Sequence, residues 1–287
     1  MLFKKNGVKT MDYSTLNEKL SSIKVEYNEE GHYLVIYLHR PKVMNALTNQ
    51  LLNEVLSVLL QAEKDRNVRC VVLRGTKEVI IKPAFSVGAD LSPAGPDIQV
   101  MNTAEKEHFM LEKLRIYDRI EEFIKPMIAA VDGFALGGGL ELSLTCDLVV
   151  ASERSSFSFP EVKHGLYPTN GGTQRMSRHI GLARTKKMIL TGDFVDAKSM
   201  LEWGFLADLY TVEEFDEKVH KLASKLGNGP TIALIYAKRS MNYGTQVPSP
   251  IGMQFESQGF GINSTSHDLD EGLKSFNEKR KPKFNGQ

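Results

Sequence analysis

The sequence contains little cysteine. Only Cys70 and Cys146 occur among 287 residues, and each lies within an apolar run. A small disulfide-stabilised scaffold carries many more cysteines, so a reducing compartment is the economical prediction. No His or basic cluster flanks either thiol, which favours a buried core role over a reactive one.

An excess of charge of one sign is also missing. Lys and Arg together number 36 against 35 Asp and Glu, which leaves a formal net charge of +1. No global field therefore attracts nucleic acid or an anionic membrane. We expect no nucleic-acid partner and no membrane partner.

Long uncharged apolar runs are absent as well. The most apolar region, Met127 to Ala151, is interrupted by Asp132, Glu141 and Asp147. A membrane-spanning helix needs about 20 largely uncharged residues, so this region does not predict one. The seven histidines are scattered, without H-E-x-x-H or Cys/His spacing, and predict no metal site.

The first 22 residues are interpreted as a polar leader. They contain no long apolar stretch of the kind found in secretory signals. They also lack Arg and include Asp12 and Glu18, which weighs against a mitochondrial transit peptide. We expect a cytoplasmic protein, and the mitochondrial matrix stays open.

Alternating strand and helix patterns predict an α/β fold. A run of β-branched and aromatic residues at His32–Leu38 predicts a strand, and Thr48 is the expected cap of the helix that follows. Past Glu161 the pattern changes to successive helices with short links. Further strands are predicted at Cys70–Arg74, Met127–Val131 and Asp147–Ala151, and helices at Thr103–Ile124, Leu182–Leu190, Asp196–Glu202, Glu213–Leu226, Thr231–Asn242, Ile251–Gly259 and Asp268–Lys279.

A glycine-rich segment, GFALGGGLEL, is the densest chemical signal. Gly137, Gly138 and Gly139 follow a predicted strand and precede an apolar helical stretch. Such a turn can leave main-chain N–H groups open to a phosphate or a developing oxyanion at a helix N-terminus. The segment has neither the Walker nor the G-x-G-x-x-G pattern. An equally good interpretation is a close helix–strand crossing that only glycine permits.

Two carboxylates lie at the two ends of the segment that follows the glycines. Glu141 lies in the glycine-rich segment, and Glu161 follows twenty residues later in FSFPE. Paired carboxylates in an apolar cleft repel, so one stays protonated while the other ionises, which supplies an acid and a base. Taken alone, each Glu also fits a helix surface or a salt bridge. A third segment, FSVGADL (Phe85–Leu91), alone predicts only a loop.

Together these segments resemble the crotonase superfamily, the enoyl-CoA hydratase/isomerase family. The similarity extends over nearly everything after the leader and also includes LHRPKVMNAL, AAVDGFALGGGLELSLTCDLVVAS, FSFPEVKHGLYPTNGGTQRM and the tail EGLKSFNEKRKPKF. It implies a ββα spiral core over residues 23–210 and a helical C-terminal trimerisation region over residues 211–287. It further implies a homotrimer or a hexamer built as a dimer of trimers, with no cofactor beyond the coenzyme A of the substrate.

The resemblance also implies roles for single residues. The backbone N–H groups of Ala89 and Gly138 would form an oxyanion hole for the thioester carbonyl. The remaining binding positions would border the acyl-CoA (Asp90, Leu91 and Ser92), lie along the CoA moiety (Val43 and Ala46), or reach the CoA of a neighbouring subunit (Phe276 and Lys279).

Glu141 and Glu161 match the two catalytic glutamates of hydratases. The expected reaction is reversible syn addition of water to a trans-2-enoyl-CoA, with Glu141 as base and Glu161 as proton donor. The reverse direction is dehydration of a 3-hydroxyacyl-CoA. The alternatives are a Δ3,Δ2-enoyl-CoA isomerase, which needs one carboxylate, and a non-enzymatic RNA-binding member of the superfamily.

Two departures from the family pattern bear on the site. The usual Pro-Gly-Ala-Gly-Gly is replaced by Pro168-Thr169-Asn170-Gly171-Gly172, so Thr169 stands where a glycine amide commonly helps to position water. An insertion of unknown purpose occupies residues 76–84.

Overall fold

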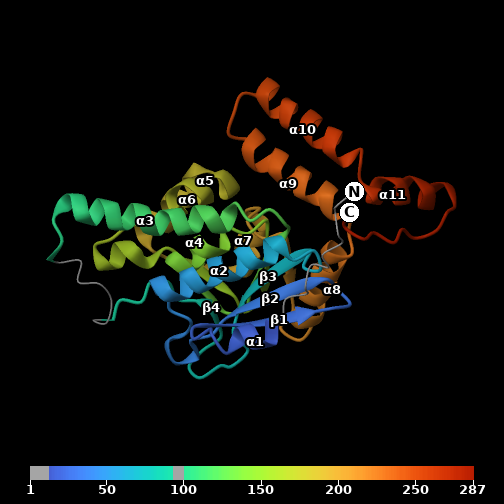
Figure 1. Ribbon diagram of the computed structural model, residues 1–287. Helices are drawn as coiled ribbons and strands as arrows, with labels where there is room; N and C mark the ends of the chain where they lie inside the picture. Colours follow the sequence, from blue (N-terminus) through green and yellow to red (C-terminus); the bar gives the residue numbers. More distant parts are fainter. Residues whose placement is uncertain (1–12, 93–99) are drawn as a thin grey trace.

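The computed structural model describes residues 13–92 and 100–287. Its larger sheet has the strand order β1-β2-β3-β5-β7-β10, in which β1 is antiparallel to β2 and the other strands are parallel (Figure 1). The central strands are mostly apolar, with Arg74 in β3 as an exception, because helices cover both faces of this sheet. The bounds are Ile23–Asn28 (β1), Tyr33–Leu38 (β2), Cys70–Gly75 (β3), Met127–Val131 (β5), Leu148–Ser152 (β7) and Asp208–Tyr210 (β10).

A smaller second sheet has the order β4-β6-β8-β9. The chain passes from the large sheet to the small one three times, from β3 to β4, from β5 to β6 and from β7 to β8, which makes the ββα spiral expected from the resemblance. The small-sheet strands are Ala84–Ser86 (β4), Phe134–Leu136 (β6), Ser156–Ser158 (β8) and Val195–Asp196 (β9). None was predicted, because three residues are too few to show an alternating pattern.

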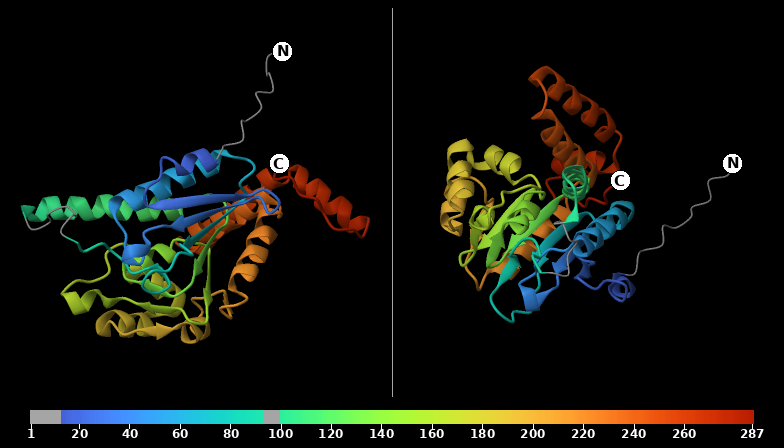
Figure 2. Two further views of the ribbon diagram at one scale, coloured as in Figure 1. Left: turned by 90° about the horizontal axis from the view of Figure 1, so that it is seen from below. Right: turned by 90° about the vertical axis from the view of Figure 1, so that its left-hand side faces the viewer.

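Helices pack on both faces of the large sheet. On one face, α2 (Asn49–Lys64) is capped by Thr48, whose Oγ1 accepts a hydrogen bond from Leu51 N at 3.1 Å, as predicted. Beside it lies the long α3 (Thr103–Glu121), which begins with a capping box at Asn102 and Glu105. The other face is covered by α8 (Phe215–Gly227) (Figure 2).

The helical end of the chain is confirmed. α9 (Thr231–Gly244) and α10 (Ser249–Asn263) pack on each other and project from the body, followed by α11 (His267–Asn277) (Figures 1 and 2). The other helices are α1 (Tyr13–Asn17), η1 (Pro41–Val43), α4 (Gly138–Ser143), η3 (Pro160–His164), α5 (Gly172–Ile180), α6 (Leu182–Thr191) and α7 (Ala197–Glu202). The sequence did not predict α5 as a helix.

Part of the expected leader packs against the body. The Tyr13 ring is 4% exposed, and its hydroxyl donates to Asp65 Oδ2 at 3.2 Å, so α1 is fastened to the end of α2. Residues 1–12 of the expected leader lie outside the described part of the chain. The boundary at residue 22 stays a prediction.

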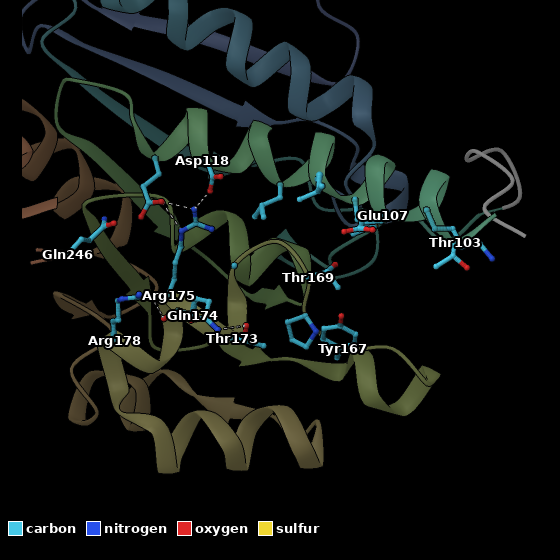
Figure 3. Close-up of a pocket in the computed structure, with 17 residues that line it drawn as sticks. Thr103, Glu107, Asp118, Tyr167, Thr169, Thr173, Gln174, Arg175, Arg178 and Gln246 are labelled. Atoms are coloured by element: carbon cyan, nitrogen blue, oxygen red, sulfur yellow. Dashed lines mark hydrogen bonds and ion pairs between the residues drawn. The ribbon is translucent and has the colours of Figure 1, made fainter. Parts of the chain in front are cut away.

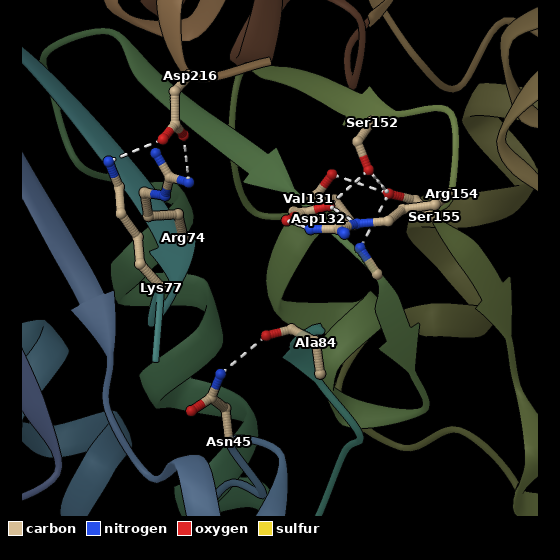
Figure 4. Close-up of polar contacts among 11 residues, drawn as sticks. Asn45, Arg74, Lys77, Ala84, Val131, Asp132, Ser152, Arg154, Ser155 and Asp216 are labelled. Atoms are coloured by element: carbon tan, nitrogen blue, oxygen red, sulfur yellow. Dashed lines mark hydrogen bonds and ion pairs between the residues drawn. The ribbon is translucent and has the colours of Figure 1, made fainter. Parts of the chain in front are cut away.

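Ion pairs tie strand ends to neighbouring elements (Figure 4). The Arg154 guanidinium donates to both oxygens of Asp132, at 2.7 and 2.5 Å, across the ends of β5 and β7. Arg74 and Lys77 both pair with Asp216 of α8, at 2.7 and 2.8 Å. The shared contacts of Arg74 and Lys77 with Asp216 hold the end of β3 against α8.

Residues 79–81 of the insertion expose apolar side chains. Val79, Ile80 and Ile81 are each about half exposed, with values of 50%, 54% and 55%. No helix of the described residues is long and apolar enough to span a membrane. Within residues 13–92 and 100–287 there is also no group of three or more His, Cys, Asp or Glu side chains that could hold a metal ion.

Candidate active site

The glycine-rich turn joins β6 to α4, and packing explains the glycines. A Cβ on Gly139 would lie 2.5 Å from the backbone O of Ser86, too close for any other residue. Gly137 has a φ of +49°, and a Cβ there would lie 2.9 Å from Glu161 Oε1. At Gly139 the close crossing of helix and strand is therefore the reason for glycine, while Gly137 brings the turn against a carboxylate.

Two backbone amides lie close together beside this turn. Gly138 is the first residue of α4, so its N–H has no acceptor within the helix. Ala89 forms an isolated parallel bridge with Leu47, in which Leu47 N donates to Gly88 O and Asp90 N donates to Leu47 O. Because successive N–H groups of extended chain point to opposite sides, the Ala89 N–H points away from Leu47.

The positions that a Cβ would take on Gly138 and Gly88 show how near the two amides are to each other. A Cβ on Gly138 would lie 3.6 Å from Ala89 N, and a Cβ on Gly88 would lie 3.2 Å from Gly138 N. Gly88 has a φ of +95°, which favours glycine. The two N–H groups predicted to form an oxyanion hole thus come from distant segments and meet at one place.

Glu141 lies in the first turn of α4 and is 1% exposed. Its Oε1 accepts hydrogen bonds from Asn170 N at 2.8 Å and from Gly172 N at 3.0 Å. Its Oε2 accepts from Asn170 Nδ2 at 2.8 Å. All three partners are donors, an arrangement that suits an ionised carboxylate, because that group only accepts hydrogen bonds.

Glu161 reaches the same turn from η3, on the other side of Gly137. Its pKa is raised to about 7, mainly by burial and to a lesser extent by the nearby charge of Glu141, while a hydrogen bond from its own backbone acts in the opposite direction. Its buried Oε2 has no hydrogen-bond partner among the described residues. The structure therefore brings the two sequence-predicted carboxylates close enough to interact, in different surroundings.

The segment expected along the acyl-CoA is held by one arginine. Arg40 Nη1 donates to Ala46 O at 2.6 Å and to Asp90 Oδ2 at 2.8 Å. The pKa of Asp90 is lowered, first by hydrogen bonds from Ser92 and then by Arg40. The Asp90 side chain therefore fastens the loop, a role that the sequence did not indicate.

The other residues of this expected binding segment differ in exposure. Leu91 is 68% exposed and Val43 40% exposed, while Ala46 is buried. Nearby, Asn45 Nδ2 donates to Ala84 O at 2.8 Å, which holds the start of β4 (Figure 4). Leu91 and Val43 thus present apolar surface to solvent.

Phe276 and Lys279 lie elsewhere. Figures 1 and 2 place α11 at the far end of the molecule from α4, and Phe276 on that helix is 82% exposed. Within one chain the structure does not bring these two residues to the site. Their expected contact with a neighbour's CoA stays a prediction.

Two side chains of α3 also lie near Gly138 and Glu141, and no sequence pattern had indicated either of them. Tyr117 is fully buried, and its hydroxyl donates to Gly138 O at 3.3 Å. Lys113 lies one turn earlier on the same face. Burial lowers the pKa of Lys113, against the attraction of the Glu141 carboxylate.

A cavity of about 800 Å³ lies between α3 and the loop that leads into α5 (Figure 3). Met110 and Leu114 line it from α3, and Tyr167, Pro168 and Thr169 line it from the loop. The same loop supplies the hydrogen-bond donors to Glu141. The cavity thus lies beside the loop that positions Glu141, and its α3 wall combines the apolar Met110 and Leu114 with charged side chains such as Glu107 and Asp118.

A ββα spiral with a carboxylate pair beside a glycine-rich helix start defines the crotonase class of proteins. The chain belongs to the enoyl-CoA hydratase/isomerase family, whose family model matches residues 28–287. It is 35% identical to the short-chain-enoyl-CoA hydratase of Clostridium acetobutylicum over 88% of this chain and 94% of that protein. It is 34% identical to the 2,3-dehydroadipyl-CoA hydratase of Escherichia coli, over 91% and 98%.

Solved structures show the same relationship. The enoyl-CoA hydratase of Bacillus anthracis superposes with a TM-score of 0.84 at 34% identity, covering 93% of this chain and 100% of that one. An enoyl-CoA hydratase subunit of Geobacillus kaustophilus gives 0.84 at 36% identity, over 93% and 99%. The crotonase fold expected from the sequence is confirmed.

Proposed function

We propose that this protein is an enoyl-CoA hydratase that adds water reversibly to a short trans-2-enoyl-CoA. The carboxylate pair carries the proposal, because hydration needs one group to take a proton and another to give one. The curated relatives support it, since they include proteins named short-chain-enoyl-CoA hydratase and crotonyl-CoA hydratase, at 35% and 32% identity.

The surroundings of the two carboxylates suggest how they divide the work. Glu141 receives three N–H donors and is suited to be the base. Glu161, whose pKa is raised to about 7 by burial and by Glu141, is suited to hold the proton that the reaction delivers.

In the proposed reaction the water oxygen bonds to Cβ while one of its protons passes to Glu141. The electron pair of the double bond moves toward the thioester, whose oxygen becomes enolate-like and is stabilised by the N–H groups of Ala89 and Gly138. Glu161 then gives its proton to Cα, which restores the thioester. Dehydration follows the same steps in reverse.

For binding, we propose that Val43, Ala46, Asp90, Leu91 and Ser92 border the acyl-CoA. The exposed apolar side chains of Val43 and Leu91 and the Arg40 contacts that order this segment support that role. No cofactor beyond the substrate's own coenzyme A takes part in these steps. A cytoplasmic location remains our prediction.

The assembly we propose is a homotrimer or a dimer of such trimers. The C-terminal helices support it, because several large apolar side chains on them face solvent in one chain. These are Met241, Met253, Phe260, Ile262, Leu273 and Phe276. In an assembly Phe276 and Lys279 could reach a neighbour's CoA. Light scattering tests this, and a monomer would contradict it.

Crotonyl-CoA tests the activity directly. We expect loss of the conjugated-thioester absorbance on adding enzyme, and formation of 3-hydroxybutyryl-CoA. Failure with every chain length of a trans-2-enoyl-CoA panel, together with turnover of a trans-3-enoyl-CoA, would favour the isomerase instead.

A further inference from the structure

We infer that Asn170 is a positioning residue, which holds Glu141 in place as the ionised base. Asn170 contacts both oxygens of that carboxylate, with N–H to Oε1 and Nδ2 to Oε2, each at 2.8 Å. This inference rests on the proposed function for its catalytic meaning, although the contacts themselves do not depend on it.

The two contacts fix the orientation of the carboxylate. A single hydrogen bond would allow the group to rotate about its last bond, whereas donors on both oxygens define its plane. Gly172 N adds a third donor to Oε1 at 3.0 Å. Asn170 itself is 5% exposed, so water competes little for these contacts.

The Asn170 amide has one workable orientation. If the amide were reversed, its Oδ1 would face the ionised Oε2, two acceptors in contact. A side chain that donates to Oε2 therefore favours the ionised form of Glu141 over the protonated one. An alanine, which the family pattern has at this position, offers no such donor.

The peptide of Asn170 is held from its other side by Arg175, whose ion pair with Asp118 is visible in Figure 3. Arg175 Nη1 donates to Asn170 O at 2.9 Å. The same guanidinium pairs with Asp118 at 2.7 Å and with Glu121 at 2.6 Å, both on α3, and its side chain is 12% exposed. A chain of contacts thus runs from α3 through Arg175 and Asn170 to Glu141.

The contact between Arg175 and Asn170 O also requires a glycine at position 171. Gly171 has a φ of +100°, and a Cβ there would lie 1.9 Å from Arg175 Nη1. Any other residue would push the guanidinium away from Asn170 O. The loop is therefore built to place Asn170, in addition to supplying backbone donors.

Several charged or titratable groups face Glu141 besides this loop. Glu161 approaches from η3, and Lys113 and Tyr117 face it from α3. None of them is altered when Asn170 is replaced, so a change in the protonation of Glu141 can be assigned to the lost amide donor.

The test compares Asn170→Ala with the wild-type enzyme and with Lys186→Ala. Lys186 lies on α6, is exposed, and is not among the residues that line the cavity. We expect Asn170→Ala to lower kcat on crotonyl-CoA on the order of 10-fold to 100-fold, with KM changed less than about threefold. The acidic limb of its pH–rate profile should move to higher pH. Lys186→Ala should change neither.

A second readout does not need turnover. Carbon-13 NMR of the glutamate carboxyl groups follows the pH at which Glu141 takes up a proton. We expect that pH to be higher in Asn170→Ala than in the wild type, and higher still in Asn170→Asp, which keeps the shape but adds a like charge.

The outcomes separate the two proposals. An inactive wild type would overturn the proposed function, and the NMR comparison would still decide the inference about Asn170. An Asn170→Ala variant that keeps the wild-type protonation of Glu141 would overturn the inference, even if the variant were less stable. A purely structural role would lower the melting temperature and leave the protonation of Glu141 unmoved.

Discussion

Glu141 and Glu161 lie close enough for their charges to interact, but their hydrogen-bonding environments are opposite. Glu141 accepts three N–H donors through both oxygens, whereas the buried Glu161 Oε2 has no partner among the described residues. Two glutamates in such different environments can serve as an acid and a base at the same pH. The proposed chemistry depends on that asymmetry.

The first prediction concerns the pH dependence of hydration. Glu161 must be protonated to act as donor, and its pKa is raised to about 7 by burial and by Glu141. As the pH rises above about 7 the group loses its proton, so kcat/KM for crotonyl-CoA should fall by up to about tenfold per pH unit. A profile that stays flat from pH 6 to pH 9 would argue against Glu161 as the donor.

A second prediction tests the coupling between the carboxylates. Glu141→Gln removes the like charge that contributes to the raised pKa of Glu161, so this pKa should decrease. It should stay above the ordinary value for glutamate, because burial is the larger cause. Carbon-13 NMR titration of Glu161 measures both effects. An unchanged pKa would mean that the two groups do not interact.

The raised pKa also has a cost for stability. In the unfolded chain Glu161 ionises near its ordinary value, but in the folded chain it stays protonated up to about pH 7. Stability is therefore lost as the pH rises between these values, and the loss is complete above about pH 7.

Glu161→Gln should remove this pH-dependent loss. We expect the variant's gain in melting temperature over the wild type to be small at pH 5 and greatest at pH 8. Thermal unfolding at both values is the measurement. A gain that does not increase with pH would count against a raised pKa for Glu161.

The glycine turn gives a prediction about packing. Gly139→Ala places a methyl group 2.5 Å from the backbone O of Ser86, so the crossing of α4 and β4 must open. We expect a loss of unfolding free energy of about 1–3 kcal/mol, together with lower activity. Gly261→Ala, on α10 with open space around it, is the matched control. Equal stabilities for the two variants would contradict this packing.

Much of this architecture was predictable from the sequence. The strands β2, β3, β5 and β7 are long apolar runs, and the helices after residue 182 have clear apolar periodicity, so both kinds of element were found. The antiparallel β1 was missed: residues 23–28 lie between the expected leader and the expected strand His32–Leu38, and the charged Lys24 and Glu26 interrupt their apolar residues. The small sheet was missed because each of its strands has only two or three residues.

The site was predictable in its residues but not in its contacts. Glu141, Glu161 and the two amides were recognised from their motifs. Asn170 and Arg175 were not, because hydrogen bonds between Asn170 and a residue 29 positions away depend on how the loop folds. The replacement of the usual Gly-Ala by Thr169-Asn170 was the available signal, and only Thr169 was given a role. The fastening of Asp90 by Arg40 was likewise outside the reach of sequence patterns.

One set of measurements tests the two-carboxylate mechanism most directly. Turnover of crotonyl-CoA should be followed for the wild type, Glu141→Ala and Glu161→Ala, at matched folding and oligomeric state. We predict a rapid wild-type reaction and a loss on the order of 10²-fold to 10⁴-fold in each variant. Wild-type activity in either variant would contradict the account.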